Sequence, residues 1–516
     1  MNNREQWGSR TGFILAAAGS AIGLGNIWKF PYIAGENGGA AFLFIYLICI
    51  VAVGLPILSV EILLGRETQK NPVGAFKSIA GKSSIWKYAG ALGVLASFTI
   101  LSFYSVVGGW SLGYTIEAFK GTFVNPSVPT TIVKFAATIN EFPYISLVSA
   151  IAEPFTLEAS KDFFGESVSN VKWIIGYHTA FFLMVVGIIL LGVKSGLERA
   201  SKFLMPTLLL ILIILAAQGL MLDGANKGIS FLFNPDWSAV NGETFLKALG
   251  HAFFTLSLGM GAMMTYGSYL SDKDDIINAS YIIVLLDTLI AILAGIAIFT
   301  VVFAAGGEPD KGPGLIFNVL TTSIADLPGA YFFGISFFLL LTIAAITSAI
   351  SILEVSVAYL VDEFKYSRKK ATLIMGILVY CAAIPCALSF NVLEDVKLFI
   401  QDKGFTFFDV ADFLASNVLL PLGGFFIAVF AGYVWGIDNV VKKLLKGNSP
   451  SVYFSNSILK SSSNKSIFGV LIKFLSPVLI IFVLFYAVSE GLKTDPPKEE
   501  IPVEQEVVPV EEVLDD

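Results

Sequence analysis

The chain has 516 residues, of which 55% are hydrophobic and only 14% are charged, and its mean hydropathy is +0.76. So few charged side chains do not cover a soluble globule of this length, so the composition excludes a soluble protein and predicts a polytopic membrane protein. The net charge of −7 comes largely from an acidic C-terminal tail and gives no reason to expect a nucleic-acid partner.

A spanning helix needs about 20 apolar residues, and the sequence predicts eleven of them. They lie at about 11–35, 41–65, 89–117, 173–193, 203–222, 245–270, 277–304, 331–360, 371–389, 406–436 and 466–490. Lys and Arg gather in alternate loops, for example at Lys82 and Lys87 and again at Lys369 and Lys370. The excess of positive charge marks the cytoplasmic side. We therefore expect a multi-pass protein of the plasma (inner) membrane, with the N-terminus in the cytoplasm and the C-terminus outside.

The first predicted span is interrupted by its own glycines. Gly19, Gly23 and Gly25 fall near its middle, and Asn26 follows at once. In lipid, irregular backbone is tolerated only where protein or a cavity covers it, and a helix broken at mid-depth offers half-helix ends and bare carbonyls as ligands. Small residues spaced by four also serve close helix packing. This pattern alone does not decide between an ion or solute site and a packing interface.

A second interruption lies in the sixth predicted span, 245–270. There Thr255 and Ser257 are followed by Gly259 and Gly261, where a plain span would carry Leu or Ile. Generic packing does not predict a second interruption at this place. The segment is therefore a second candidate for a broken helix at mid-depth.

Spans one and six begin two five-span halves, at about 1–222 and 245–436, which together form a transporter core over 1–436. Because five is odd, the second half starts from the opposite side of the membrane and must be inverted. Paired interruptions at matching positions of inverted halves indicate a transporter with a site near the membrane midplane. Residues 437–491 are predicted to form a cytoplasmic loop and the eleventh span, and the acidic tail 492–516 to be disordered.

Polar side chains inside other spans point to the same site. Asp287 lies within span seven, and a lone intramembrane carboxylate is a functional candidate that is usually paired with an ion or a proton. Thr347 and Ser348 place two adjacent hydroxyls in span eight, although such groups often bond back to their own helix. Tyr104 in span three is a phenol that needs a partner, or else an aromatic packing residue.

Long motifs identify a family. The opening from Arg4 through the glycine-rich break to Tyr32 resembles that of the neurotransmitter:sodium symporters, and so do the segment FFTLSLG at 253–259 and the pair Thr347-Ser348. The resemblance extends to about residue 436, and the eleven-span plan is similar to the family's bacterial hydrophobic and aromatic amino-acid transporters. It implies an all-α integral membrane protein with a LeuT-like inverted repeat, which imports an amino acid by sodium symport and alternating access.

The resemblance implies two sodium ions. The first would bind the Ala21 carbonyl, Asn26, Thr255 and Asp287, together with the substrate carboxylate. The second would bind the carbonyls of Gly19, Ile22 and Ala344 and the hydroxyls of Thr347 and Ser348. Sodium is a hard cation that takes oxygen ligands. A substrate oxygen in the first shell would couple the binding of the ion to that of the substrate.

The same resemblance implies the substrate contacts. A half-helix N-terminus around Leu24 and Gly25 would hold the carboxylate. The full set would be Ala21, Leu24, Gly25, Ile100, Tyr104, Phe254, Thr255, Ser257, Met260, Ser348 and Ile352. No charged side chain lines this set, and Met260 is adaptable. We therefore expect a neutral hydrophobic or aromatic amino acid, with Trp, Tyr, Phe and Leu as the leading candidates.

Gates are also implied by the resemblance. Lys29 and Asp412 would close the outer side, with Phe254 as a lid and Tyr269 further inside. The family more often carries Arg at the position of Lys29, so a bidentate contact is lost here. The cytoplasmic latch would consist of Arg4, Asp362 and Trp7.

Two departures from the family pattern bear on mechanism. Many members need chloride and have a neutral Asn where this chain has Asp287, and Ala291, one turn later, lacks the hydroxyl that those members use. A fixed carboxylate offsets sodium charge, so we expect no chloride requirement. His251 replaces the usual Gln, and it is expected to be a neutral hydrogen-bond partner or a participant in proton exchange near Asp287.

Other functions are less compatible with the sequence. A channel needs a continuous pore, and an enzyme needs a nucleophile, a base or a metal set, none of which the sequence offers. Cys49, Cys381 and Cys386 lie in apolar segments with no metal spacing. A sodium-dependent amino-acid receptor with little transport stays open as the alternative. The sequence does not determine the oligomeric state, and the expected partners are the substrate and the lipid bilayer.

Overall fold

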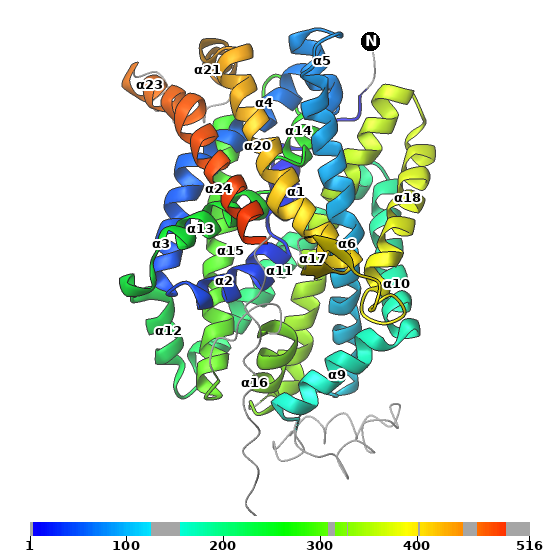
Figure 1. Ribbon diagram of the computed structural model, residues 1–516, viewed down its shortest axis with the longest axis vertical. Helices are drawn as coiled ribbons and strands as arrows, with labels where there is room; N and C mark the ends of the chain where they lie inside the picture. Colours follow the sequence, from blue (N-terminus) through cyan, green and yellow to red (C-terminus); the bar gives the residue numbers. More distant parts are fainter. Residues whose placement is uncertain are drawn as a thin grey trace, which may run out of the picture.

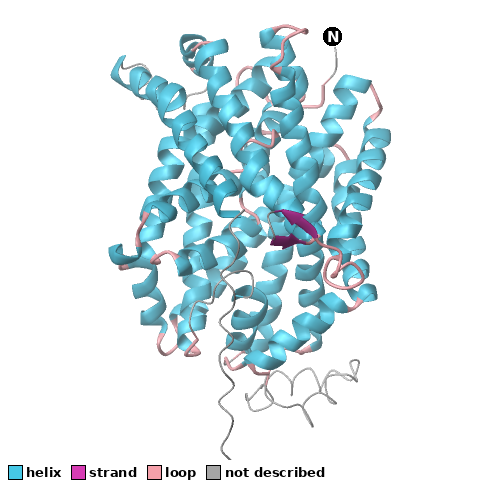
Figure 2. Cartoon of the chain, in the orientation of Figure 1, coloured by secondary structure: helices cyan, strands magenta, loops and turns pink. Residues whose placement is uncertain are grey.

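The computed structural model describes residues 4–124, 155–307, 315–327, 329–400, 403–446 and 462–491. Over these residues the chain is almost entirely helical, as predicted, and most helices run along the long axis of the molecule (Figure 1 and Figure 2). The exception within them is one antiparallel hairpin, β1 (Leu398–Ile400) and β2 (Lys403–Phe405). The predicted acidic tail lies outside the described residues.

Within that part of the chain, nine helical segments are long and apolar enough to cross a membrane. The single-helix spans are α6 (Lys87–Lys120), α10 (Val171–Leu190), α15 (Ile276–Ala304), α17 (Ala330–Phe364) and α18 (Arg368–Leu388). The composite spans are α3 (Ala40–Cys49), η2 (Ile50–Gly54) and α4 (Leu55–Thr68); η3 (Val193–Glu198) and α11 (Arg199–Leu220); α19 (Phe407–Asp412), η6 (Phe413–Leu419), α20 (Leu420–Val429) and η7 (Phe430–Val434); α23 (Ser462–Val470), η8 (Leu471–Leu475) and α24 (Ser476–Gly491). The remaining helices are α1 (Arg10–Ala21), η1 (Gly25–Lys29), α2 (Phe30–Glu36), α5 (Pro72–Ala80), α9 (Leu157–Ser169), α12 (Ala225–Phe233), η4 (Trp237–Ala239), α13 (Gly242–Thr255), α14 (Ala262–Gly267), η5 (Leu315–Leu320), α16 (Thr321–Ala325) and α21 (Ile437–Leu444).

The first span is broken at its glycines. α1 ends at Ala21, and the backbone of the next residue, Ile22, is extended. The helix resumes through η1 and α2, which together are bent by 44° from α1. Close approach of other helices explains Gly23, because a Cβ there would collide with the Ser348 hydroxyl and would lie 2.8 Å from the Tyr104 hydroxyl. A larger residue would therefore fill the space that the break opens.

The sixth span is interrupted between α13 and α14. Three residues of the connecting turn have positive φ angles, Ser257 (53°), Gly259 (83°) and Gly261 (78°), so the turn cannot continue a right-handed helix. Because of this turn, α13 and α14 do not form one apolar spanning helix. The eleven predicted spans thus appear as nine continuous spans, one bent pair and one interrupted segment.

The two broken spans run in opposite directions and lie against each other. Figure 1 shows that the chain descends from α1 to α2, whereas it ascends from α13 to α14. α14 packs on α1, and α13 packs on η1. An inverted repeat requires opposite directions of its first members. The assignment of the two repeats to 1–222 and 245–436 stays a prediction.

α17 forms the centre of the bundle. Its most apolar stretch is 89% buried, whereas the corresponding stretches of Val193–Leu220 and Lys465–Ser489 are 33% buried. It packs on α6, α11 and α1. The polar residues of α17 therefore face other helices, and the apolar outer helices face the lipid.

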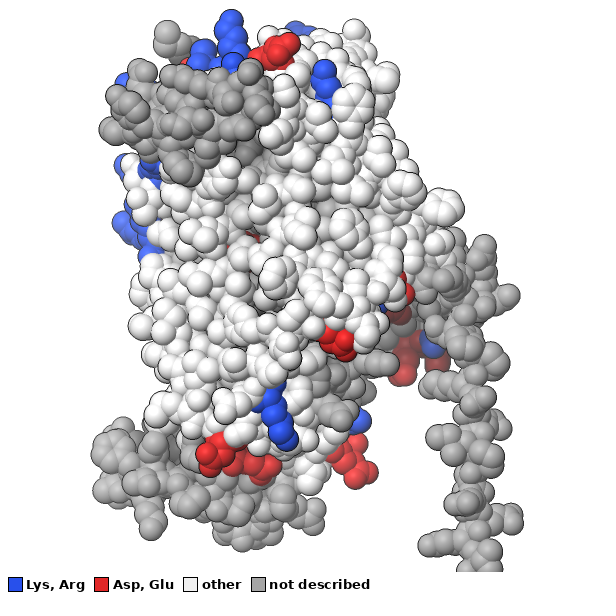
Figure 3. All heavy atoms as spheres, turned by 90° about the vertical axis from the view of Figure 1, so that its left-hand side faces the viewer, with Lys and Arg blue, Asp and Glu red and all other residues white. Residues whose placement is uncertain are grey.

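The two ends of the bundle differ in charge. The end that carries α5 and α21, here called the N-terminal face, lies near the start of the chain, and the opposite face carries α9, α12 and α16 (Figure 1). In the view of Figure 3, a broad uncharged band separates the two ends, and Lys and Arg gather toward the N-terminal face. This is the surface that a membrane-spanning protein presents to lipid and to the two aqueous sides.

Candidate functional site

A small cavity of about 20 Å³ lies where the two broken spans meet α6 and α17. Its lining is Ser20, Ala21, Gly23, Leu24, Gly25, Ile100, Tyr104, Phe254, Ser257, Met260, Ser348 and Ile352. Every residue that the sequence analysis assigned to substrate binding lines this cavity except Thr255, which is buried beside Asp287. Ser20 and Gly23 also line the cavity but were not among the predicted substrate contacts. Ser20 has two contacts of its own. Its hydroxyl lies 2.7 Å from that of Ser351, and its carbonyl accepts from Ser257 at 2.8 Å.

One end of the cavity is polar. The Leu24 amide donates to the Tyr104 hydroxyl at 3.2 Å, so this phenol reaches the start of η1. Three serines, Ser20, Ser257 and Ser348, also line the cavity, and the lining contains no Lys, Arg, Asp, Glu or His. The apolar part is formed by Ile100 on α6, Met260 in the turn before α14 and Ile352 on α17, among other residues. The arrangement suits a small molecule with one polar end and an apolar body.

Beside the cavity, the Asp287 carboxylate collects three donors. Its Oδ1 accepts from the Asn26 amide at 2.8 Å and from the Thr255 hydroxyl at 2.9 Å, and its Oδ2 accepts from the Tyr46 hydroxyl at 3.1 Å. The Thr255 hydroxyl also lies 3.1 Å from Asn26 Oδ1. Asp287 is fully buried, and no Lys, Arg or His forms a salt bridge with it within the described residues. Tyr46 was not among the predicted residues, although it is a phenol within an apolar span, as Tyr104 is.

A second group of oxygens joins α17 to the break in α1. The Thr347 hydroxyl lies 3.5 Å from the Ile22 carbonyl and 3.0 Å from the Ala344 carbonyl. The Ser348 hydroxyl lies 3.3 Å from the Gly19 carbonyl. Each of the five oxygen groups predicted for the second sodium ion thus lies within 3.5 Å of another member of the set. Carbonyl and hydroxyl oxygens are ligands that a hard cation prefers.

His251 does not bond to Asp287. Its imidazole is buried among the rings of Phe30, Phe42 and Tyr46, with centroid distances of 6.0, 6.4 and 5.3 Å. In the described part of the chain, neither ring nitrogen has a hydrogen-bond partner. Tyr46 takes the place beside the carboxylate that the sequence analysis gave to His251.

At the N-terminal face, a latch ties the first residues to the bundle. Arg4 forms a salt bridge with Asp362 at 2.7 Å and donates to the Ser268 hydroxyl at 2.6 Å. Trp7 donates to the Tyr266 carbonyl at 3.0 Å. Arg4, Asp362 and Trp7 thus come together as expected.

Tyr269, which was expected further inside than the Phe254 lid, lies at this latch. The Arg4 guanidinium lies 4.9 Å above its ring, and its hydroxyl donates to Glu354 at 2.6 Å. Glu354 is fully buried and receives two bonds from Arg368, at 3.0 and 2.6 Å. Glu354 and Arg368 were missed, although a carboxylate in an apolar span is the signal that identified Asp287.

Two further buried carboxylates hold the broken helices. Glu61 on α4 accepts from the Gly259 amide at 2.7 Å, which fixes the turn between α13 and α14. Glu198 on η3 accepts from the Gly8 amide at 2.5 Å and from the Ser9 hydroxyl at 2.8 Å, which fixes the start of α1. Neither carboxylate was among the predicted site residues.

The outer pair is not formed in this conformation. The Lys29 ammonium lies 4.4 Å from the centroid of the Phe254 ring, and Asp412 accepts from the Ser416 hydroxyl at 2.8 Å. No salt bridge joins Lys29 to Asp412 in the described ranges. Each group has an alternative partner, a ring face for the ammonium and a hydroxyl for the carboxylate.

The comparisons with known proteins agree with this architecture. The model of the sodium:neurotransmitter symporter family matches residues 4–490. YhdH of Bacillus subtilis (strain 168), described as an uncharacterized sodium-dependent transporter, is 37% identical over 481 residues, covering 93% of this chain and 96% of that protein. A sodium-dependent transporter of Methanocaldococcus jannaschii is 35% identical over 448 residues, covering 85% of this chain and 83% of that protein.

A solved structure shares the fold. The crystal structure of MhsT in complex with L-phenylalanine has a TM-score of 0.78 and 41% sequence identity, and the match covers 94% of this chain and all of that one. The LeuT-like architecture expected from the sequence is thereby confirmed, and the chain is a multi-pass sodium-dependent transporter rather than an enzyme. On these findings together, the chain belongs to the sodium:neurotransmitter symporter family.

Proposed function

We propose that this chain is a sodium-coupled symporter that imports neutral hydrophobic or aromatic L-amino acids by alternating access. The observation that carries the proposal is the meeting of two interrupted helices at one buried cavity, beside the Asp287 carboxylate. A buried carboxylate with no cationic side chain beside it calls for a cation or a proton. Membership of a sodium-dependent transporter family favours sodium.

Two sodium ions are proposed. The first binds oxygens of Ala21, Asn26, Thr255 and Asp287 together with the substrate carboxylate, and the second binds oxygens of Gly19, Ile22, Ala344, Thr347 and Ser348. Support comes from the close approach of Asn26, Thr255 and Asp287 and from the hydroxyl-to-carbonyl contacts across the α1 break. The ion and the substrate would each complete the binding site of the other. That mutual requirement is the physical basis of coupled transport.

The proposed substrate lies with its carboxylate toward Tyr104 and the start of η1, and with its side chain among Ile100, Met260 and Ile352. The apolar lining supports a neutral side chain, because a charged one would be buried without a partner. Phe254 covers the cavity as a lid. The crystal structure of MhsT with L-phenylalanine supports an amino acid as the ligand.

Chloride independence is part of the proposal. Asp287 supplies a fixed negative charge next to the first ion. Ala291, one turn further along α15, is fully buried and offers no hydroxyl to an anion. The negative charge of Asp287 would repel a chloride ion placed beside it.

The N-terminal face is proposed to be cytoplasmic, in the plasma (inner) membrane, with the C-terminus outside. The support is the gathering of Lys and Arg at that face (Figure 3). The Arg4–Asp362 latch would then open to release substrate into the cell. On the outer side, closure by Lys29 and Asp412 would require Lys29 to leave the Phe254 ring.

Uptake of radiolabelled L-tryptophan and L-leucine into proteoliposomes tests the proposal. An inward sodium gradient is imposed, with chloride replaced by gluconate, and protein-free vesicles and a sodium ionophore serve as controls. Accumulation that needs sodium and persists without chloride is the expected result. Binding without accumulation would support the receptor alternative. Absence of both would refute the assignment of the cavity.

A further inference from the structure

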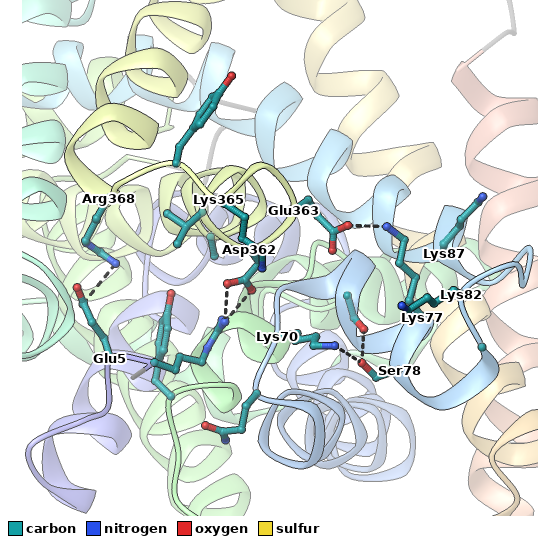
Figure 4. A pocket seen from close by; sticks show the side chains of 18 residues that line it. Glu5, Lys70, Lys77, Ser78, Lys82, Lys87, Asp362, Glu363, Lys365 and Arg368 are labelled. Atoms are coloured by element: carbon teal, nitrogen blue, oxygen red, sulfur yellow. Dashed lines mark hydrogen bonds and ion pairs between the residues drawn. The ribbon is translucent and has the colours of Figure 1, made fainter. Parts of the chain in front are cut away.

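A large cavity of about 1160 Å³ lies at the N-terminal face, away from the central cavity and next to the latch. One wall is made by α5 and its flanking loops, and the other by the end of α17 and its connection to α18. Figure 4 shows Lys70, Lys77, Lys82 and Lys87 on one side, and Asp362, Glu363, Lys365 and Arg368 across from them. We call this space the basic cavity.

The charges that line the basic cavity are unbalanced. Seven Lys and Arg side chains face three acidic ones, which are Glu5, Asp362 and Glu363. Each acidic group already has a cationic partner, Arg368 for Glu5, Arg4 for Asp362 and Lys77 for Glu363. All three carboxylates are therefore occupied.

Four lysines are left over. Within the described residues, no salt bridge involves Lys70, Lys82, Lys87 or Lys365. Lys70 donates to the Ser78 hydroxyl at 2.9 Å, and the Lys87 ammonium lies 5.1 Å from the Tyr88 ring centroid. Four like charges around one hollow repel one another, and an anion among them would relieve that repulsion.

The position of the cavity relative to the membrane indicates which anions can reach it. Lys87 is the first residue of the spanning helix α6, and Arg368 is the first residue of α18. The ends of spanning helices lie at the level of lipid head groups, where clustered Lys and Arg attract anionic lipids. A phosphate group offers several acceptor oxygens to ammonium donors.

We propose that the basic cavity binds a phosphate-bearing anion, either the head group of an anionic phospholipid or a soluble phosphate compound, through Lys70, Lys82, Lys87 and Lys365. The usual positive charge of an inner membrane face does not by itself account for this arrangement. Lys442 and Lys446 on the same face are exposed and lie outside the cavity, so the general charge of the face and the cavity can be separated by experiment.

Binding in the basic cavity would act on the latch. Arg4 and Asp362 both line the cavity, and so do Lys77 and Glu363. An anion placed among these cations competes with Asp362 for Arg4, and with Glu363 for Lys77. Occupation therefore favours release of the first residues from α17.

The test measures lipid retention directly and needs no transport activity, so it is independent of the proposed function. Full-length protein in detergent is incubated with phosphatidylglycerol or phosphatidylcholine, and the retained lipid is counted by native mass spectrometry. The cavity variant is Lys82→Gln with Lys365→Gln, which changes two exposed side chains. The matched control is Lys442→Gln with Lys446→Gln.

The expected result is preferential retention of phosphatidylglycerol by the wild-type protein, with an affinity that falls by roughly 30-fold in the cavity variant, since each lysine near an anionic lipid contributes about a factor of five. The control variant should retain the lipid as the wild type does. Equal losses in both variants would overturn the proposal, and so would the absence of both a preference for phosphatidylglycerol and binding of inorganic phosphate by the wild type.

A second arm separates the two sources of phosphate. Inorganic phosphate is titrated against bound phosphatidylglycerol in the wild type. Displacement at millimolar concentration would show that the cavity takes a phosphate group from either source. If phosphatidylglycerol stays bound to the wild type in the presence of phosphate, and the cavity variant fails to retain it, the cavity is specific for the lipid.

Discussion

Replacing Asp287 by asparagine removes the central charge of the first proposed sodium site at nearly constant side-chain size. The carboxylate accepts from Asn26 and Thr255 on one oxygen and from Tyr46 on the other, at 2.8, 2.9 and 3.1 Å. An asparagine oxygen can keep the first two bonds, and its amide can then donate to the Tyr46 hydroxyl. The fold should therefore survive, whereas the charge that holds the cation is lost.

The size of the effect follows from Coulomb's law. Two unit charges about 4 Å apart attract by about 4 kcal/mol at an effective dielectric constant near 20. At about 1.4 kcal/mol for each factor of ten, this corresponds to roughly a thousandfold in sodium affinity. Water that enters the site would screen part of this attraction. We expect sodium affinity to fall by about 100- to 1000-fold.

Sodium titrations of radiolabelled L-tryptophan binding in detergent measure this loss, with chloride or gluconate as the anion. Chloride should restore part of the affinity of the Asp287→Asn variant, because it can return a negative charge to the site. Asp275→Asn is the matched control, since Asp275 caps the same helix and asparagine caps a helix equally well. If Asp287→Asn binds within threefold of the wild type in gluconate, the counter-charge argument is wrong.

Three further changes test other contacts. Gly12→Ala should destabilise the protein by about 1–3 kcal/mol, because the added Cβ collides with the buried Glu198 carboxylate. The loss in apparent melting temperature should shrink in a Glu198→Ala background, and an undiminished loss would contradict this contact. Arg4→Gln removes a part-buried charged contact worth about 1.5–3 kcal/mol. Amide hydrogen exchange over residues 4–21 should therefore accelerate by roughly tenfold or more. Unchanged exchange would mean that the latch does not hold this segment. Tyr46→Phe removes a donor to Asp287, so half-maximal substrate binding should need several-fold more sodium, and an unaltered sodium titration would exclude a role for the hydroxyl.

The breaks in the two central helices could be predicted from the sequence because glycine has direct backbone consequences. Gly259 and Gly261 adopt positive φ angles, and Gly23 leaves space for two hydroxyls. Asp287 could be predicted for a similar reason, since an isolated carboxylate in an apolar span is costly. These signals are local, so one sequence suffices to find them.

The partners of these residues could not be predicted in the same way. Glu61, Glu198 and Glu354 each bind a group from a distant segment, and the sequence does not reveal which segments meet. The expected salt bridge between Lys29 and Asp412 depends on the conformation of flexible side chains. Here the lysine lies over an aromatic ring instead.

The small size of the central cavity has a volumetric consequence. A cavity that accepts a benzene ring needs about 150 Å³, whereas the space between α1, α6, α13 and α17 is about 20 Å³. Admitting an aromatic side chain must therefore expand the packed core by far more than the volume of a water molecule. Substrate entry must consequently move the surrounding helices apart, and this movement must be larger for L-tryptophan than for L-alanine.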